Sequence, residues 1–201
     1  MIKNVIFDYG QVLVHVDSEY MTAKYIENKK DIKIISDVIF DRLYWDKLDA
    51  GTISDDEVVR LCCERLPEKY HDAVSEIYYD WIYNLPPIEG MEEILVKLKN
   101  KGVRLFLLSN ISFYFIDHAH EFSVLSHFEK CFFSAKCGFT KPSKEIFNLV
   151  CKDRNISPSE TLFIDDSEKN INGAKNCSIS TYLFDGDVKK LEKHLENCGI
   201  L

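Results

Sequence analysis

Five short apolar runs, separated by stretches with helical periodicity, constrain the fold of this chain more than any other feature. They are rich in Val, Ile, Leu and Phe and span residues 3–8, 103–109, 130–134, 160–165 and 179–184. Runs of this length without strict polar alternation are typical of parallel strands that helices cover on both faces. The sequence therefore predicts an α/β fold built on a mainly parallel sheet.

Helical periodicity is clearest over 91–101, where four apolar residues fall at i, i+3, i+4 and i+7 and Gly102 follows as a stop signal. Further helices are expected to begin near Pro142, Ser167 and Asp187, because proline suits a first helical turn and serine and aspartate cap N-termini. These helices alternate with the predicted strands, as a parallel sheet requires.

The segment from about residue 18 to 84 differs, because it contains helical patterns and no convincing strand. One helix ends before Gly51, and Ser54 and Glu57 form a capping box that opens the next. A helical insert therefore interrupts the α/β part directly after its first strand. The predicted boundaries are 1–16 and 86–201 for the α/β core and 17–85 for the insert.

Composition excludes several classes of function. The chain has 201 residues, 46% of them hydrophobic and 29% charged, which is ordinary for a soluble globular protein with a sizeable core. A net charge of −8 without a Lys/Arg stripe argues against a nucleic-acid partner. No apolar run has the length of a membrane span and no signal-peptide pattern opens the chain, so we expect no membrane partner. Seven cysteines without a C-x-x-C pair favour reduced thiols and a cytoplasmic location.

Four polar clusters follow the predicted strands or open the helices after them. They are Asp8, Ser109-Asn110, Thr140-Lys141-Pro142 and Asp165-Asp166. In open α/β sheets the ligand crevice lies outside the carboxyl ends of the strands, so we expect these clusters to converge. A carboxylate such as Asp8 at the end of a buried strand is costly unless it meets a metal, a substrate or a hydrogen-bonding nest. The pattern therefore indicates a polar site at this edge of the sheet.

Four segments of the chain, in order, resemble the four motifs of the haloacid dehalogenase-like hydrolase superfamily. They are Phe7–Leu13, Leu107–Asn110, Lys141–Phe147 and Phe163–Ala174. The resemblance covers nearly the whole chain, and the helical insert matches the small cap of such proteins. It implies a Rossmann-like, doubly wound core, a mobile helical cap, bound Mg²⁺ and, most often, hydrolysis of a phosphate monoester. The partner is then a small phosphorylated metabolite.

Under this resemblance, Asp8 attacks phosphorus as a carboxylate and forms an aspartyl-phosphate that water then hydrolyses. Mg²⁺ prefers oxygen ligands, and the expected set is Asp8, the Gly10 carbonyl, Asp165 and Asp166. The expected phosphate-binding residues are Ser109, Asn110 and Lys141, of which Ser109 and Lys141 also act in catalysis. Asn170 is expected to fix the loop after Asp166 rather than to touch substrate.

Position 10 departs from the family pattern, since most phosphatases of this superfamily have an aspartate there that protonates the leaving group and then activates water. Gly10 can do neither, and such an acid–base group is worth about 10²–10⁴ in rate. A leaving group that needs little protonation suffers least, which points weakly toward sugar 1-phosphates. His15 and Asp17 are candidates for a substitute acid, although their place also suits a structural hinge before the cap.

Two alternative functions stay open at this point. The 2-haloacid dehalogenases of the superfamily also lack the second aspartate, but the Asp165-Asp166 pair gives a dehalogenase no advantage. A metal- and phosphate-binding sensor without turnover would keep every binding residue and lose only the acid.

Substrate identity is expected to depend on cap residues that face the crevice. The candidate segment is 43–52, in which Trp45 and Lys47 could contact a sugar or a phosphate. An amphipathic helix end explains these two residues equally well.

Overall fold

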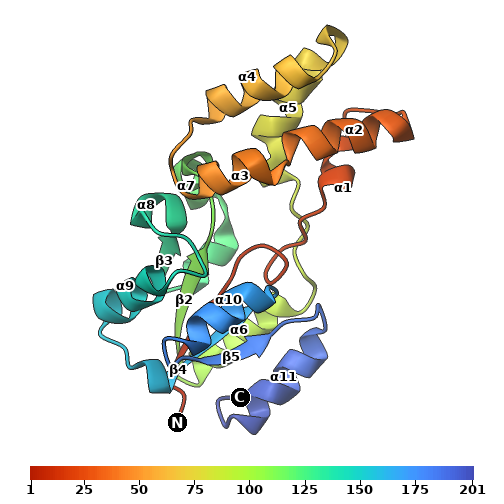
Figure 1. The fold of residues 1–201 in the computed structure, drawn as a ribbon. Helices are drawn as coiled ribbons and strands as arrows, with labels where there is room; N and C mark the ends of the chain where they lie inside the picture. The colour runs from red at the N-terminus through yellow and green to blue at the C-terminus, as the bar shows by residue number, and fades with distance from the viewer.

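The computed structural model describes residues 1–201, and at its centre lies a parallel sheet of five strands in the order β3-β2-β1-β4-β5 (Figure 1). The strands are β1 (Asn4–Phe7), β2 (Arg104–Ser109), β3 (Lys130–Phe133), β4 (Thr161–Asp165) and β5 (Ser180–Leu183). Each lies within one of the five apolar runs, so the predicted α/β fold is confirmed. The amino-terminal strand β1 pairs with β2 on one side and β4 on the other, which places it in the middle of the sheet.

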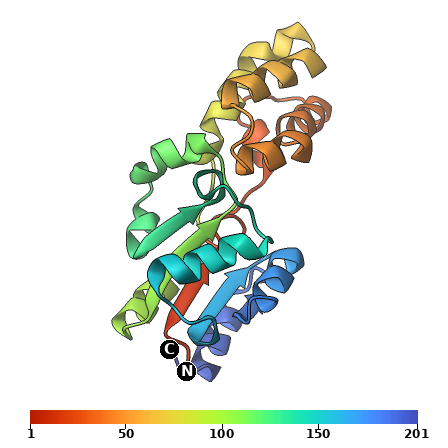
Figure 2. The same cartoon turned by 60° about the vertical axis from the view of Figure 1, so that its left-hand side comes forward.

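Helices cover both faces of the sheet, as the doubly wound arrangement requires (Figure 2). One face packs against α6 (Met91–Asn100), α7 (Phe113–His118) and α11 (Val188–Asn197), and the other against α9 (Lys144–Arg154) and α10 (Glu168–Lys175). Successive strand residues point to opposite faces: Val5 and Phe7 belong to the first core and Ile6 to the second. Because both faces are buried, the strands read as continuous apolar runs.

From residue 18 to residue 84 the chain forms helices and turns without a strand, and this region lies at the top of Figure 1. Its α-helices are α1 (Ser18–Thr22), α2 (Lys29–Ile39), α3 (Arg42–Asp49), α4 (Asp55–Arg65) and α5 (His71–Asp80). A hydrophobic core of 11 buried residues holds it together and is distinct from the two cores of the sheet. Ser54 accepts a hydrogen bond from the Glu57 amide at the start of α4, in agreement with the predicted capping box. We refer to this helical region as the cap.

The cap rests on the sheet through a contact at the carboxyl end of α3. The Ser134 hydroxyl, at the start of α8 (Ser134–Cys137), donates to the Asp49 carbonyl oxygen at 2.6 Å. Gly51 has φ +68°, and a Cβ there would lie 3.0 Å from the carbonyl oxygen of Ala135. This close approach requires glycine, which therefore lets the cap dock against α8, directly after β3.

The other short elements are 3₁₀ turns at Glu68–Tyr70, Trp81–Tyr83, Ala119–Glu121, Ser123–His127 and Pro158–Glu160. Helix α9 begins at Lys144 with Ser143 as its N-cap, so Pro142 lies in the preceding loop rather than in the first helical turn. None of the helices combines the length and apolar character that a membrane crossing needs.

Candidate active site

Three functional side chains are brought together because they follow adjacent parallel strands. Asp8 comes directly after β1, and its amide donates to the Ile164 carbonyl in β4 at 2.9 Å. Ser109 is the last residue of β2, and Asp165 is the last residue of β4. Since β1 lies between β2 and β4, all three end at the same edge of the sheet. This edge is where open α/β sheets bind ligands.

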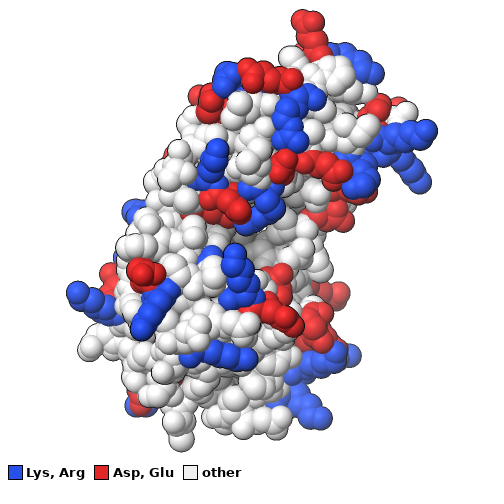
Figure 3. Space-filling model, in the orientation of Figure 1, with Lys and Arg blue, Asp and Glu red and all other residues white.

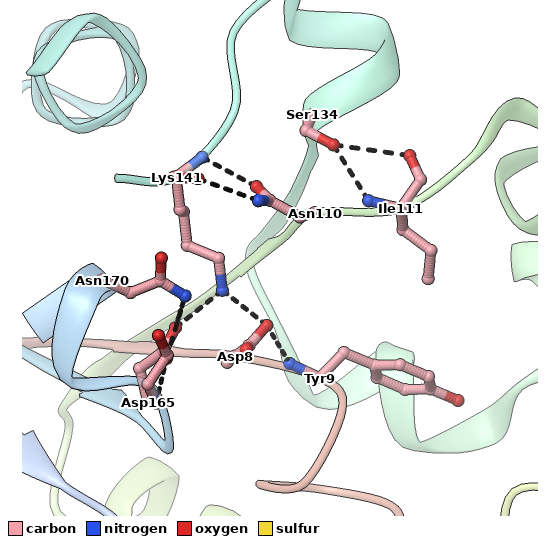
Figure 4. A network of polar contacts seen from close by, with 9 residues as sticks. Asp8, Tyr9, Asn110, Ile111, Ser134, Lys141, Asp165 and Asn170 are labelled. Carbon is pink, nitrogen blue, oxygen red and sulfur yellow. Dashed lines mark hydrogen bonds and ion pairs between the residues drawn. The ribbon is translucent and has the colours of Figure 1, made fainter. Parts of the chain in front are cut away.

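Lys141 joins two of these carboxylates from a loop that is far away in sequence (Figure 4). Its Nζ atom lies 2.7 Å from Asp8 Oδ1 and 2.7 Å from Asp165 Oδ2. The Lys141 side chain is only 1% exposed, which is rare for lysine and tolerable here because two opposite charges surround it. Lys141 therefore separates the two negative charges.

Asn110 holds the loop that carries Lys141. Its side-chain oxygen accepts a hydrogen bond from the Lys141 amide at 2.7 Å, and its Nδ2 donates to the Lys141 carbonyl at 3.0 Å (Figure 4). This reciprocal pair ties the end of β2 to the Lys141 backbone. The structure thus gives Asn110 a positioning role that the sequence interpretation missed, and direct phosphate binding by Asn110 stays a prediction.

The carboxylates of Asp8, Asp165 and Asp166 form one acidic cluster, in which an oxygen from each lies within 4.8 Å of the others. Asp165 is fully buried, and Asn170 Nδ2 donates to both of its oxygens at 3.0 and 3.1 Å. Asn170 therefore fixes the loop after β4, as predicted. Asp166 is exposed at the cluster's outer side.

The electrostatics of the cluster favour a bound cation. Burial raises the pKa of the Asp8 carboxyl to about 7, Lys141 opposes this rise, and Asp165 adds to it. Burial acts to lower the pKa of the Lys141 ammonium, but Asp8 and Asp165 together raise it above its ordinary value. Burial and Asp165 also raise the pKa of Asp166. One lysine thus does not fully compensate three crowded carboxylates, and this oxygen donor set fits Mg²⁺.

Asp8 and Lys141 line a cavity of about 340 Å³ between the sheet and the cap. Figure 3 shows charged side chains around a recess between these two parts of the molecule. No hydrophobic residue lines the cavity, whose lining residues are Asp8, Gly10, Arg42, Asp49, Ser109, Asn110, Lys141, Ser167, Lys169 and Asn170. Of the predicted residues of the sheet edge, Asp8, Gly10, Ser109, Asn110 and Lys141 line the cavity, whereas Asp165 and Asp166 do not. The cap contributes Arg42 and Asp49, which the sequence interpretation missed. The spacing in α3 could have indicated them, because Arg42 and Asp49 are seven residues apart and therefore lie on the same face of the helix.

The cap residues named from the sequence do not line this cavity. Trp45 belongs to the cap–core packing: its Nε1 donates to the Ile39 carbonyl at 2.8 Å, and its ring lies edge-on to Trp81. Lys47 is exposed outside the cavity. The structure therefore gives no support to substrate contacts from these two residues, and their positions agree with the amphipathic-helix interpretation.

The two candidate substitute acids also lie elsewhere. Asp17 caps α1 by accepting a hydrogen bond from the Tyr20 amide at 2.9 Å. His15 is exposed and lies beside surface hollows outside the cavity that contains Asp8. These positions agree with a structural role at the start of the cap, and a role as substitute acid stays an untested prediction for both residues.

Gly10 lines the cavity, and its backbone conformation does not depend on glycine. Its φ is outside the left-handed region, and the residue with positive φ is Gln11, at +56°. A Cβ at position 10 would meet only Val16 Cγ2, at 3.2 Å. The backbone therefore does not require glycine at position 10, which makes the missing side chain a chemical feature of the site.

Comparisons with known proteins agree with this geometry. The family model of haloacid dehalogenase-like hydrolases matches residues 9–184. D-ribitol-5-phosphate phosphatase of Bacteroides thetaiotaomicron is 30% identical over 90% of this chain and 91% of its own length. The chain belongs to the haloacid dehalogenase-like hydrolase family, as the motifs predicted.

Two solved structures of this family resemble the chain over nearly its whole length. An enzyme of the family from Bacteroides thetaiotaomicron, in complex with magnesium and inorganic phosphate, has a TM-score of 0.67 at 29% identity and covers 90% of this chain and 93% of its own. A hydrolase of the same family from Porphyromonas gingivalis has a TM-score of 0.70 at 27% identity, with 97% and 98% of the two chains covered.

Proposed function

We propose that this protein is a magnesium-dependent phosphatase of small phosphorylated metabolites, with Asp8 as the nucleophile. The observation that carries the proposal is the asymmetry of the Asp8 carboxylate. Its Oδ1 accepts hydrogen bonds from Lys141 and from the Tyr9 amide, both at 2.7 Å, whereas Oδ2 has no hydrogen-bond partner within the chain. One oxygen is therefore held in place while the other is available for attack at the floor of the cavity.

The chain's own residues supply most of what phosphoryl transfer needs. Asp8 Oδ2 attacks phosphorus, the ester P–O bond breaks, and water then hydrolyses the aspartyl-phosphate. Lys141 keeps Asp8 oriented and places positive charge beside the transferring group, and Ser109 offers a hydroxyl donor to a phosphoryl oxygen. Mg²⁺, held by Asp8, Asp165, Asp166 and the Gly10 carbonyl, would neutralise the charge between these carboxylates and a phosphate dianion.

The cavity favours a hydroxylated substrate. Its lining contains no hydrophobic residue, and the cap side contributes charged groups from Arg42 and Asp49. Such groups form hydrogen bonds with hydroxyls, while an apolar chain would leave them without partners. The relative from Bacteroides thetaiotaomicron that acts on D-ribitol 5-phosphate supports the same class. We therefore propose polyol and sugar phosphates as substrates, with sugar 1-phosphates included because Gly10 lacks an acid.

The site argues against one of the two alternatives, a dehalogenase, and does not separate the other, a sensor, from a phosphatase. Halide displacement by a carboxylate needs no metal and gains nothing from the cluster of Asp8, Asp165 and Asp166. A sensor without turnover would keep the same cluster, so only an activity measurement separates it from a phosphatase.

The test measures phosphate release from a panel of polyol and sugar phosphates with Mg²⁺ or with EDTA. We expect metal-dependent release that falls to background in Asp8→Asn and persists in Asp17→Asn, whose site caps α1 outside the cavity. Chloride release from a 2-haloacid without metal would replace this proposal with a dehalogenase. Tight binding of Mg²⁺ and phosphate without turnover would replace it with a sensor.

A further inference from the structure

Asp49 is a buried carboxylate whose presence packing does not explain. The residue is 5% exposed and lines the same cavity as Asp8. No hydrogen bond within the chain reaches its carboxylate oxygens, and its nearest cation, Arg42, lies 4.0 Å away. A largely buried carboxylate without hydrogen bonds in the chain needs partners from the cavity, either solvent or a bound ligand.

The backbone around Asp49 is fixed against the sheet. Its carbonyl oxygen accepts a hydrogen bond from the Ser134 hydroxyl at 2.6 Å. The same hydroxyl oxygen accepts a hydrogen bond from the Ile111 amide at 2.9 Å, and Figure 4 shows this second contact. Ile111 follows the end of β2, two residues after Ser109. The docked cap thus fixes the backbone of Asp49, a residue that lines the same cavity as Asp8, so its carboxyl group is available to the leaving group of a phosphate bound beside Asp8.

Charged groups from both sides face the Asp49 carboxylate. Burial raises the pKa of Asp49 to about 6; Arg42 and, from the sheet side, Lys141 lower it, whereas Asp46 on its own helix raises it. Lys169 of α10 also lines the cavity. A carboxyl group that titrates near neutral pH can both donate and accept a proton during turnover.

We propose that Asp49 is the general acid and base of the reaction, and that it replaces from the cap the carboxylate missing at position 10. This inference rests on the phosphatase function proposed above. When Asp8 forms its bond to phosphorus, the P–O bond to the substrate breaks and the Asp49 proton passes to the leaving oxygen. The resulting Asp49 carboxylate then takes a proton from water as the water oxygen bonds to phosphorus. The bond between Asp8 and phosphorus breaks, which releases phosphate and restores both carboxyl groups.

The first test compares Asp49→Asn with the unaltered protein on aryl phosphates whose phenols differ in acidity. These substrates carry no sugar hydroxyls, so lost substrate recognition does not imitate a lost acid. We expect kcat/KM in Asp49→Asn to fall about 10²-fold for the least acidic phenol and roughly tenfold or less for the most acidic. The steeper dependence on phenol acidity is the signature of a missing acid.

The matched control is Asp46→Asn, on the same helix. Asp46 also pairs with Arg42, but it is exposed and does not line the cavity. Because Asp46 acts on Asp49 only through its charge, which raises the pKa of Asp49, we expect Asp46→Asn to keep the dependence on phenol acidity and to shift only the pH profile toward lower pH.

The second test restores an acid at position 10. Gly10→Asp is accommodated because only the tip of Val16, a 37% exposed side chain, lies close to the new Cβ. We expect Gly10→Asp to rescue Asp49→Asn on substrates with poor leaving groups by about tenfold or more, and to improve the unaltered protein less.

The outcomes separate this inference from the function on which it rests. If no aryl or sugar phosphate is hydrolysed with Mg²⁺ by the unaltered protein, the phosphatase function itself is wrong. If the unaltered protein is active and Asp49→Asn keeps the same dependence on phenol acidity, only the role of Asp49 is overturned. An equal effect of Gly10→Asp with and without Asp49 would also overturn it.

Discussion

Two ion-pair networks lie at opposite ends of the sheet and have almost the same distances. At the carboxyl ends of the strands, Lys141 lies 2.7 Å from both Asp8 and Asp165. At the amino ends, Arg104 and Arg154 lie 2.7 and 2.8 Å from Glu129. Only the first network contributes residues, Asp8 and Lys141, to the lining of the polar cavity beneath the cap.

Burial separates the two networks. The side chains of Lys141, Asp8 and Asp165 are 1%, 12% and 0% exposed, whereas those at the amino ends are 29–38% exposed. Charges that water cannot screen interact strongly, and losing one partner leaves the others uncompensated. Exposed pairs at the same distances contribute little. Ion-pair distance alone therefore does not identify a site, and the predictions below test this difference.

The largest effect is expected for Lys141→Met. Removing the ammonium leaves Asp8 and Asp165 buried without a counter-charge, which should cost about 3–5 kcal/mol in the free energy of unfolding at neutral pH. Phosphatase activity should fall to background because Asp8 also loses its positioning partner. Chemical denaturation and phosphate release measure the two effects.

Lys144→Met is the control, since Lys144 is an exposed lysine three residues further along the chain. It should change the free energy of unfolding by less than about 0.5 kcal/mol. An equal loss of unfolding free energy in Lys141→Met and Lys144→Met would contradict the claim that burial makes the Lys141 ion pairs strong.

A smaller effect is expected for Gly173→Ala in α10. A Cβ at this position would lie 2.5 Å from the Pro142 carbonyl oxygen, so the loop that carries Lys141 must move. We expect a loss of about 1–3 kcal/mol in the free energy of unfolding and a lower kcat. Asn172→Ala, exposed on the same helix, should leave kcat unchanged. Unaltered activity in Gly173→Ala would show that the Lys141 loop tolerates displacement.

The smallest effect is expected for Glu129→Gln at the amino ends. Arg104 is the main reason that the pKa of Glu129 is lowered from 4.5 to about 2, with Arg154 contributing. A lowered folded-state pKa stabilises the protein above about pH 4.5, and this contribution is lost as the pH falls toward 2. Because Glu129 is 38% exposed, solvent screening limits the contribution to about 1 kcal/mol or less.

Unfolding curves between pH 2 and pH 7 measure this contribution. Glu129→Gln should flatten the dependence of stability on pH below about 4.5 and leave kcat unchanged. A loss at neutral pH as large as that of Lys141→Met would remove the distinction between the two networks.

The sheet and its edge were predictable because strand periodicity and strand ends are local properties of the sequence. Uninterrupted apolar runs gave all five strands, and Asp8, Ser109 and Asp165 were found because each ends one of them. Lys141 was predicted as a site residue only because its motif resembles the family's, since nothing in the local sequence distinguishes it from a surface lysine. Its burial between two carboxylates depends on contacts across long stretches of chain.

The cap side of the site was not predictable in the same way. Trp45 was a candidate for contact with a sugar or a phosphate, but its ring packs against Phe40 and Trp81. The rotation of α3 decides which of its side chains face the cavity. That rotation is fixed by Ser134 and Gly51, which a reading of α3 alone does not include. The position of Arg42 and Asp49 in the cavity therefore depends on how the cap docks on the sheet, which the sequence of α3 alone does not show.

The central claim, that Asp8 becomes phosphorylated, is tested most directly by acid quenching during turnover. The protein is mixed with Mg²⁺ and a hydrolysed sugar phosphate, quenched within one turnover, digested, and its peptides are weighed by mass spectrometry. The account predicts a phosphoryl group on the peptide that contains Asp8, absent without substrate and absent in Asp8→Asn. Substrate hydrolysis without any phosphoryl adduct on that peptide, or an adduct on another residue, would contradict it.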